Sequence, residues 1–281
     1  MIMNDIINQP SKESSLVPQQ LSYSSYFDNK SHLLFIALGS FFIANAVIAE
    51  FVGVKVFSLE RSLGSEPLNF QFLGMNFSLN LTAGALLWPL IFVITDIINE
   101  YFGRRGVKIL SYIAITLIGY GFLIVYFTMG LEPAEFWIMR NTDQGVINME
   151  VAFDAVFGQG LWITIGSLFA FLVGQFIDMG LFYQVKRITG ERYLWLRSTG
   201  STMISQLFDS FIVLFISFHV NPATNWDLTV IIAMGTVKYS YKLIVAVALT
   251  PLIYLLHIAI DNYLGEPLAN QLKRQAMQQN T

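Results

Sequence analysis

Three carboxylates, Asp96, Asp178 and Asp209, lie inside long apolar stretches of this chain. A carboxylate at the centre of a membrane helix costs roughly 2.5–3.5 kcal/mol on insertion scales, so each should face a bundle interior or water and find a partner. A carboxylate accepts hydrogen bonds from N–H groups, and a lysine such as Lys242 can donate them. These residues therefore predict a polar solute-binding site enclosed by apolar helices.

Helical spacing places further polar groups beside these carboxylates. At 100° per residue, Trp88, Phe92, Thr95 and Asn99 fall on one stripe of a helix, with Asp96 at its edge. A second stripe has nearly the same spacing and consists of Ser198, Ser201, Thr202, Ser205 and Asp209. Trp88 is the tryptophan predicted to lie mid-membrane, and its flat ring suits a flat, hydrogen-bonding ligand.

Most of the candidate binding residues have a predicted depth between the membrane midplane and the cytoplasmic side. They are Trp88, Asp96, Asn99, Gln175, Asp178, Ser201, Ser205, Asp209 and Lys242.

Several of these residues also have a structural interpretation. Ser201 and Ser205 are of the small type that packs helices together. Asp96 can reach interfacial water, and Asp178 can pair with Arg187. Lys242 can extend its ammonium group to the outer surface. Polar groups at similar depth on several helices favour a binding site over these separate explanations.

The elements that must position these residues are membrane helices. The chain is 54% hydrophobic and 12% charged, whereas a globular domain carries about 25% charged residues. The apolar residues gather in six blocks, which predicts an all-α polytopic membrane protein. The predicted spans are about 33–54, 79–98, 109–129, 160–182, 198–219 and 228–260. The last block is too long for one simple crossing, which leaves two possibilities: a long kinked helix, or a short outer helix that leads into the span.

Basic residues set the predicted orientation. Three lie in the odd-numbered loops, namely Lys55, Arg61 and Arg140. Eleven lie in the even-numbered loops and the two tails, namely Lys12, Lys30, Arg104, Arg105, Lys108, Lys186, Arg187, Arg192, Arg197, Lys273 and Arg274. The positive-inside rule therefore predicts six spans with both termini in the cytoplasm.

The predicted domain organisation has three parts. Residues 1–31 are polar and are expected to form a disordered cytoplasmic tail. Residues 32–262 form the six-helix transmembrane domain, and residues 263–281 form a C-terminal cytoplasmic tail. The connection from 130 to 159 is acidic, and the sequence assigns it no function.

Several function classes find no support in the residues. The chain has no cysteine, which excludes disulfides and thiolate metal sites. It shows neither a cluster of residues at metal-ligand spacing nor a Ser/His pair of the kind that catalyses hydrolysis. We therefore predict that the chain is not an enzyme and has no catalytic residue, metal or cofactor. The sequence contains no basic domain that could bind along a phosphate backbone, so nucleic-acid binding is not expected.

Four ordered segments resemble the VUT family of queuosine-precursor transporters, six-span proteins of the bacterial inner membrane. They are Trp88-Pro89-Leu90-Ile91-Phe92-Val93-Ile94-Thr95-Asp96 with Phe102-Gly103, then Gly174-Gln175-Phe176-Ile177-Asp178, then Ser201-Thr202 with Asp209, and last Lys242-Leu243-Ile244 with Pro251. The match covers about residues 80–260.

The resemblance implies import of 7-cyano- or 7-aminomethyl-7-deazaguanine for tRNA queuosine modification. The expected partners are this deazapurine and the lipid bilayer, with at least one of Asp178 and Asp209 accepting the ring N–H and amino protons. The alternative is the substrate-binding subunit of an energy-coupled vitamin or nucleobase importer. The sequence leaves open the choice of precursor, the energy source, and the existence of a homo-oligomer or of coupling subunits.

Overall fold

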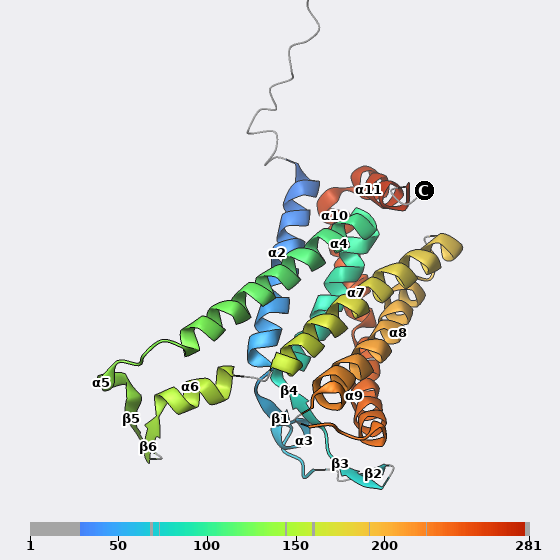
Figure 1. Cartoon of the computed structure of the whole chain (residues 1–281). Coiled ribbons are helices and arrows are strands. Elements are labelled where there is room, and N and C mark those ends of the chain that lie inside the picture. The colour runs from blue at the N-terminus through green and yellow to red at the C-terminus, as the bar shows by residue number, and fades with distance from the viewer. Residues whose placement is uncertain are drawn as a thin grey trace, which may run out of the picture.

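The computed structural model describes residues 29–67, 70–72, 74–143, 145–158, 161–190, 192–222 and 224–278, and it is mostly helical (Figure 1). Residues 1–28 of the predicted N-terminal tail lie outside this described part. The main helices are α2 (Lys30–Val52), α4 (Trp88–Met129), α7 (Leu161–Thr189), α8 (Leu194–Leu214), α9 (Leu228–Ala248), α10 (Thr250–Leu264) and α11 (Glu266–Gln278).

The connections hold short elements, including strands that the all-α prediction did not contain. The short helices are α3 (Leu59–Ser62), α5 (Glu135–Ile138) and α6 (Met149–Phe157), with η1 (Ala83–Leu86) and the π-helical η2 (Phe215–Val220). The strands form three antiparallel pairs: β1 (Val56–Ser58) with β4 (Asn80–Thr82), β2 (Phe70–Phe72) with β3 (Met75–Phe77), and β5 (Met139–Thr142) with β6 (Gly145–Asn148).

Five helical segments in the described part are long and apolar enough to cross a membrane, with mean hydropathies from 1.5 to 2.0. They are Lys30–Val52, Trp88–Met129, Ile163–Thr189, Leu194–Val220 and Leu228–Ala248. The predicted polytopic membrane class is therefore confirmed.

Helix α4 is the longest element and contains a sharp bend. Its 42 residues would extend about 63 Å if straight, roughly twice the hydrocarbon thickness of a bilayer. Gly103 breaks it with φ 69° and ψ −176°, a left-handed backbone that favours glycine. In Figure 1 the first part of α4 rises toward α11, and the second part turns back toward α5. One helical element thus contains the third predicted apolar block and the part of the second block from Trp88 onward.

Two predicted blocks have different boundaries in the structure. The block from residue 79 becomes α-helical only at Trp88, because β4 pairs with β1 and the chain then passes through η1. Pro89 lies in the first turn of α4, where its missing N–H costs no hydrogen bond. The last block is divided into α9 and α10, and Pro251 begins α10 in the same way.

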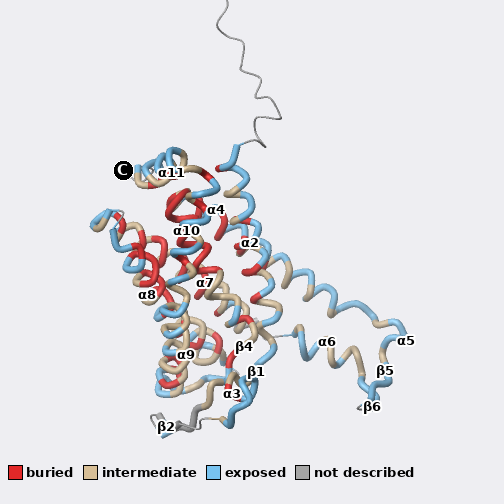
Figure 2. Tube along the Cα trace, turned by 180° about the vertical axis from the view of Figure 1, so that it is seen from behind, coloured by how far each residue is buried: buried red, intermediate tan, exposed pale blue. Residues whose placement is uncertain are grey.

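The bundle packs around two apolar clusters. The first joins α2, α4 and α7 through residues such as Phe42, Ile91 and Phe171. The second joins α4 to α10 and α11 through Tyr101, Ile253 and their neighbours. Helix α11, which lies within the predicted C-terminal tail, therefore packs on the bundle. Buried residues gather on α4, α7, α8 and α10, whereas the segment from α5 to α6 is largely exposed (Figure 2).

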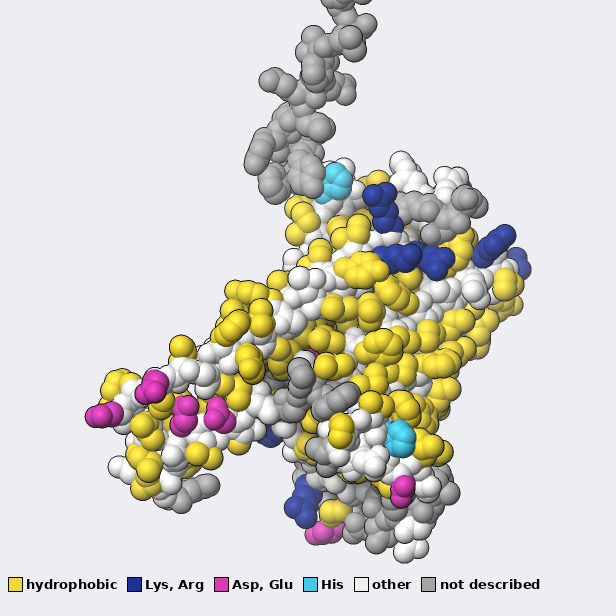
Figure 3. All heavy atoms as spheres, in the orientation of Figure 1, with side chains coloured by type: hydrophobic (Ala, Val, Ile, Leu, Met, Phe, Trp, Pro, Cys, Tyr) yellow, Lys and Arg dark blue, Asp and Glu magenta, His cyan; other side chains and the backbone are white. Residues whose placement is uncertain are grey.

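The surface is divided by charge in the view of Figure 3. Lysine and arginine side chains gather at the end that holds α11, and acidic side chains gather on the α5–α6 segment. Yellow apolar side chains cover the region between them. The basic end is the one that holds α11, which belongs to the C-terminal tail that the basic residues of the sequence predict to be cytoplasmic.

Candidate functional site

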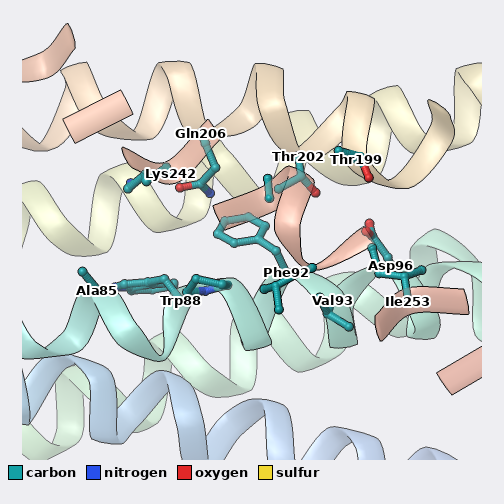
Figure 4. A pocket seen from close by; sticks show the side chains of 13 residues that line it. Ala85, Trp88, Phe92, Val93, Asp96, Thr199, Thr202, Gln206, Lys242 and Ile253 are labelled. Carbon is teal, nitrogen blue, oxygen red and sulfur yellow. The ribbon is translucent and has the colours of Figure 1, made fainter. Parts of the chain in front are cut away.

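One pocket lies among α4, α8, α9 and α10, with an empty volume of about 460 Å³ that includes its open mouth (Figure 4). Its lining consists of Ala85, Trp88, Pro89, Phe92, Val93, Asp96, Thr199, Thr202, Gln206, Lys242, Ala246, Leu249 and Ile253.

Helix α4 supplies the aromatic side of the pocket. Trp88, Phe92 and Asp96 follow one another at intervals of four residues and so lie near one face of the helix. The Trp88 ring packs against Phe171 of α7, with ring centroids 5.2 Å apart. In Figure 4 these α4 side chains lie opposite Lys242, Gln206 and the α8 threonines. A flat solute could therefore stack on the rings with polar groups at its edges.

Asp96 is the carboxylate that lines this pocket, although only 1% of its surface is exposed. Its Oδ2 accepts a hydrogen bond from the Ser198 hydroxyl of α8. Its Oδ1 is buried and has no hydrogen-bond partner within the described chain. Because an ionised carboxylate accepts several hydrogen bonds, Asp96 retains capacity for a donor on a solute.

Helix α8 carries two polar stripes side by side. Thr199, Thr202 and Gln206 face the pocket. Ser201 and Ser205 instead face α7, where both donate to Asp178. Gln206 Nε2 is buried without a partner within the described chain, so it remains a potential donor.

Asp178 lies between α7 and α8 and does not line the pocket. Its Oδ1 accepts hydrogen bonds from Ser201, Thr202 and Ser205 at 2.9, 3.3 and 3.3 Å. The residue is fully buried, and no ion pair to Arg187 is found in the described structure. Asp178 holds α8 against α7, and Thr202 belongs to both the bonded set and the pocket lining.

Lys242 brings a cation from α9 to the pocket. Its ammonium group forms an ion pair with Asp209 of α8. The two side chains are 18% and 20% exposed, so the pair is neither sealed off nor fully solvated. Lys242 lines the pocket while Asp209 does not, which makes the lysine the member that a solute can reach.

A buried ion-pair cluster lies one helical turn beyond Asp96 along α4. Glu100 pairs with Lys186 of α7 and with Arg197 of α8, each at 2.9 Å. Lys186 also donates to the Glu100 carbonyl at 3.0 Å. Arg197 donates to the Gly190 carbonyl at 2.9 Å. The cluster ties three helices together next to the pocket, and Glu100 was not among the residues predicted to bind a solute.

The structure separates the nine predicted site residues into two groups. Trp88, Asp96 and Lys242 line the pocket. Asn99 donates to the Met179 carbonyl at 3.3 Å, and Gln175 accepts from Thr95 at 3.3 Å, so both face the α4–α7 contact. The residues outside the pocket lining are Asn99, Gln175, Asp178, Ser201, Ser205 and Asp209.

Several lining residues were not among the predicted site residues. The polar ones are Thr199, Thr202 and Gln206. Successive members lie three and four residues apart on α8, and that helical spacing was a usable signal. The apolar lining at the start of α10 consists of Leu249, which lies between α9 and α10, and Ile253, and it carries no chemical signal in the sequence. No group of three or more His, Asp or Glu side chains that could hold a metal ion occurs in the part of the chain that the structure describes.

Comparison with known proteins identifies the family. Residues 82–256 match the family model described as "Putative vitamin uptake transporter". A Bacillus subtilis protein named "Probable queuosine precursor transporter" is 32% identical over 176 residues, which cover 60% of this chain and 69% of that protein. A Haemophilus influenzae protein of the same name is 25% identical over 178 residues, covering 62% and 67% of the two chains.

No solved structure matches this chain. The family model nevertheless spans more than half of the sequence, including most of the pocket lining and the bend at Gly103. The chain therefore belongs to the vitamin uptake transporter family.

Proposed function

We propose that this chain imports a free 7-deazaguanine precursor of queuosine across the bacterial inner membrane, as a transporter and not as an enzyme. The proposed arrangement has six spans, with the two parts of α4 as the second and third, and with both termini in the cytoplasm. Family membership and the names of the two relatives support a transport role. The excess of basic residues in the even-numbered loops supports the orientation.

The observation that carries the proposal is the chemistry of the pocket lining. A deazaguanine presents an N1–H and a 2-amino group as donors and a ring carbonyl as an acceptor. The pocket offers a carboxylate oxygen of Asp96 without a protein partner, and donors from Gln206 and Lys242. Trp88 and Phe92 provide flat surfaces for the bicyclic ring. We propose that Asp96 accepts the N–H protons and that Lys242 or Gln206 donates to the carbonyl.

This assignment moves the principal carboxylate from Asp178 and Asp209 to Asp96. Asp96 lines the pocket, whereas Asp178 and Asp209 do not. Oδ2 of Asp178 is buried without a partner in the described chain, as Oδ1 of Asp96 is, but it lies in the α7–α8 contact, where three hydroxyls bind the other oxygen. Asp209 is paired with Lys242. We propose that Asp178 contributes by fixing α8, whose Thr199, Thr202 and Gln206 then face the solute.

Queuosine content of tRNA tests this proposal in cells that lack both their own importer and de novo precursor synthesis. Cells fed the precursor should make queuosine when they express this chain. In Asp96→Asn, the amide oxygen can still accept the hydrogen bond from Ser198. The amide NH₂ group then faces the pocket, where it meets the N–H donors of the base without an acceptor between them. Losing a charge-assisted hydrogen bond in a desolvated site costs roughly 1.5–3 kcal/mol, so uptake should fall about ten- to a hundredfold.

The matched control is Asp154→Asn, an equal change at an exposed residue of α6. It should leave uptake unchanged. Full uptake by Asp96→Asn at normal membrane levels would remove Asp96 from the site. Saturable uptake of an unrelated vitamin, with none of deazaguanine, would favour the energy-coupled importer.

A further inference from the structure

We infer that the pocket accepts the neutral 7-cyano base and rejects the cationic 7-aminomethyl base, and that Lys242 is the residue that sets this specificity. The inference rests on the proposed function and names its substrate more closely. It starts from the arrangement of the two charged side chains in the pocket lining, Asp96 and Lys242.

The pocket has an anionic end and a cationic end. In Figure 4, Asp96 lies at one end, whereas Lys242 lies at the other, opposite Trp88. Helix α8 shows the separation, because Ser198 donates to Asp96 and Asp209 pairs with Lys242. These two α8 residues are eleven positions apart, which corresponds to about 16 Å along the helix axis. A planar bicyclic base therefore meets the two ends of the pocket with opposite edges.

The proposed contact to Asp96 determines which edge of the base faces Lys242. Oδ1 of Asp96 is buried without a partner in the described chain, and in the proposed pose it accepts from the N1–H and 2-amino groups. In a guanine ring, the 2-amino group lies on the minor-groove edge, whereas the carbonyl and ring position 7 lie together on the major-groove edge. The substituent at position 7 is therefore the group directed toward Lys242.

Positive charge dominates this end of the pocket. Lys242 belongs to the lining, and its partner Asp209 does not. Lys238 lies one turn earlier on α9 and forms no ion pair within the described part of the chain. Asp96, the carboxylate of the lining, lies at the far end and binds the guanine edge in the proposed pose. A cationic substituent directed at Lys242 thus meets a like charge, and the lining offers it no carboxylate at this end.

The two precursors differ in the group that occupies this position. The nitrile is uncharged and its nitrogen accepts a hydrogen bond, so the Lys242 ammonium group can donate to it. The aminomethyl group is an alkylamine and carries a positive charge at neutral pH, as a lysine side chain does. It brings two cations together, which lowers affinity. Turning the base end for end gives no relief, because the N1–H and 2-amino donors then face the Lys242 donor.

Competition for uptake into proteoliposomes tests this inference, with radiolabelled 7-cyano-7-deazaguanine as the transported probe. Unlabelled 7-aminomethyl-7-deazaguanine should inhibit uptake by the wild-type chain at least about tenfold more weakly than the unlabelled cyano base. Juxtaposed like charges normally cost more affinity than this, and the charge of Asp209 offsets a part. Unlabelled 7-hydroxymethyl-7-deazaguanine is uncharged and close in size to the aminomethyl base, so it should compete nearly as well as the cyano base.

Substitution of Lys242 tests the role of its charge. Lys242→Met removes the cation and leaves Asp209 to attract an ammonium group, so the aminomethyl base should then compete at least as well as the cyano base. If this variant does not insert, Lys242→Met/Asp209→Asn replaces it without an unpaired carboxylate, and the discrimination should disappear. Binding of the probe to purified protein in detergent gives the same comparison if a variant no longer transports. Lys108→Met, at an exposed lysine of α4, is the matched control and should keep the wild-type discrimination.

The outcomes separate the specificity from the proposed function. If the aminomethyl base competes as well as the cyano base, or better, the inference fails while the proposed function stands. Weak competition by both the hydroxymethyl and the aminomethyl base would make size the cause of rejection and would overturn the role of charge. Full discrimination by Lys242→Met would overturn the role of this lysine. Absence of uptake of both precursors by the wild-type chain would overturn the proposed function and, with it, the inference.

Discussion

The buried cluster of Glu100, Lys186 and Arg197 gives a sharp stability prediction. Glu100 is the anion between two cations, and the side chains of all three are at most 4% exposed. The substitution Glu100→Gln removes the negative charge while keeping the size of the side chain. It leaves the buried ammonium group of Lys186 and the buried guanidinium group of Arg197 without the anion that both contact.

The expected cost follows from this burial. Breaking a buried ion pair by removing one partner costs about 3–5 kcal/mol, because the remaining charge is left uncompensated. At about 2–4 °C per kcal/mol for a chain of this size class, the melting temperature should fall by about 6–20 °C. Size-exclusion chromatography of detergent-solubilised protein heated to a series of temperatures measures this change in melting temperature. Glu132→Gln is the exposed control and should melt as wild type.

A second substitution separates charge balance from simple loss of packing. Lys186→Met leaves Glu100 paired with Arg197, so this change alone should cost less than Glu100→Gln. The double variant Glu100→Gln/Lys186→Met retains one uncompensated cation instead of two, so it should melt above Glu100→Gln. If Glu100→Gln melts with the exposed control, or if the double variant melts below both single variants, electrostatic compensation is not what stabilises this cluster.

Two further predictions concern topology and helix packing. A reporter that is active only outside the cytoplasm, fused after Thr281, should be silent because both termini are predicted to be cytoplasmic; strong activity would reverse the topology. The variant Gly174→Cys/Asp209→Cys should form a disulfide between α7 and α8, since a Cβ at position 174 would lie 3.6 Å from that of Asp209. The chain has no native cysteine to interfere, and Gly180→Cys, with open space around it, provides a control that should not cross-link to position 209.

Much of the architecture could be predicted from local properties of the sequence. Apolar blocks and their lengths identify membrane helices because the bilayer requires continuous apolar surface and internal hydrogen bonding over a fixed thickness. The basic residues near Arg104 and Lys186 predict the orientation because Lys and Arg close to the ends of spans are retained on the cytoplasmic side. The shared depth of Asp96, Asp178 and Asp209 also follows from their positions along each block, since depth increases with every residue of a helix.

Which of these groups face the pocket depends instead on tertiary packing. Asp178 and Asp96 have similar predicted depths, but Asp178 accepts hydrogen bonds from the α8 hydroxyls, whereas Asp96 lines the pocket that α9 and α10 also bound. That difference depends on how each helix is rotated and on which neighbours it packs against, and these relations join residues far apart in the chain. The Glu100 cluster is of the same kind, because its three charges are separated by 86 and 97 positions. Local sequence properties therefore specify the membrane helices and the kinds of groups within them, whereas long-range packing specifies which groups bind each other and which remain available to a solute.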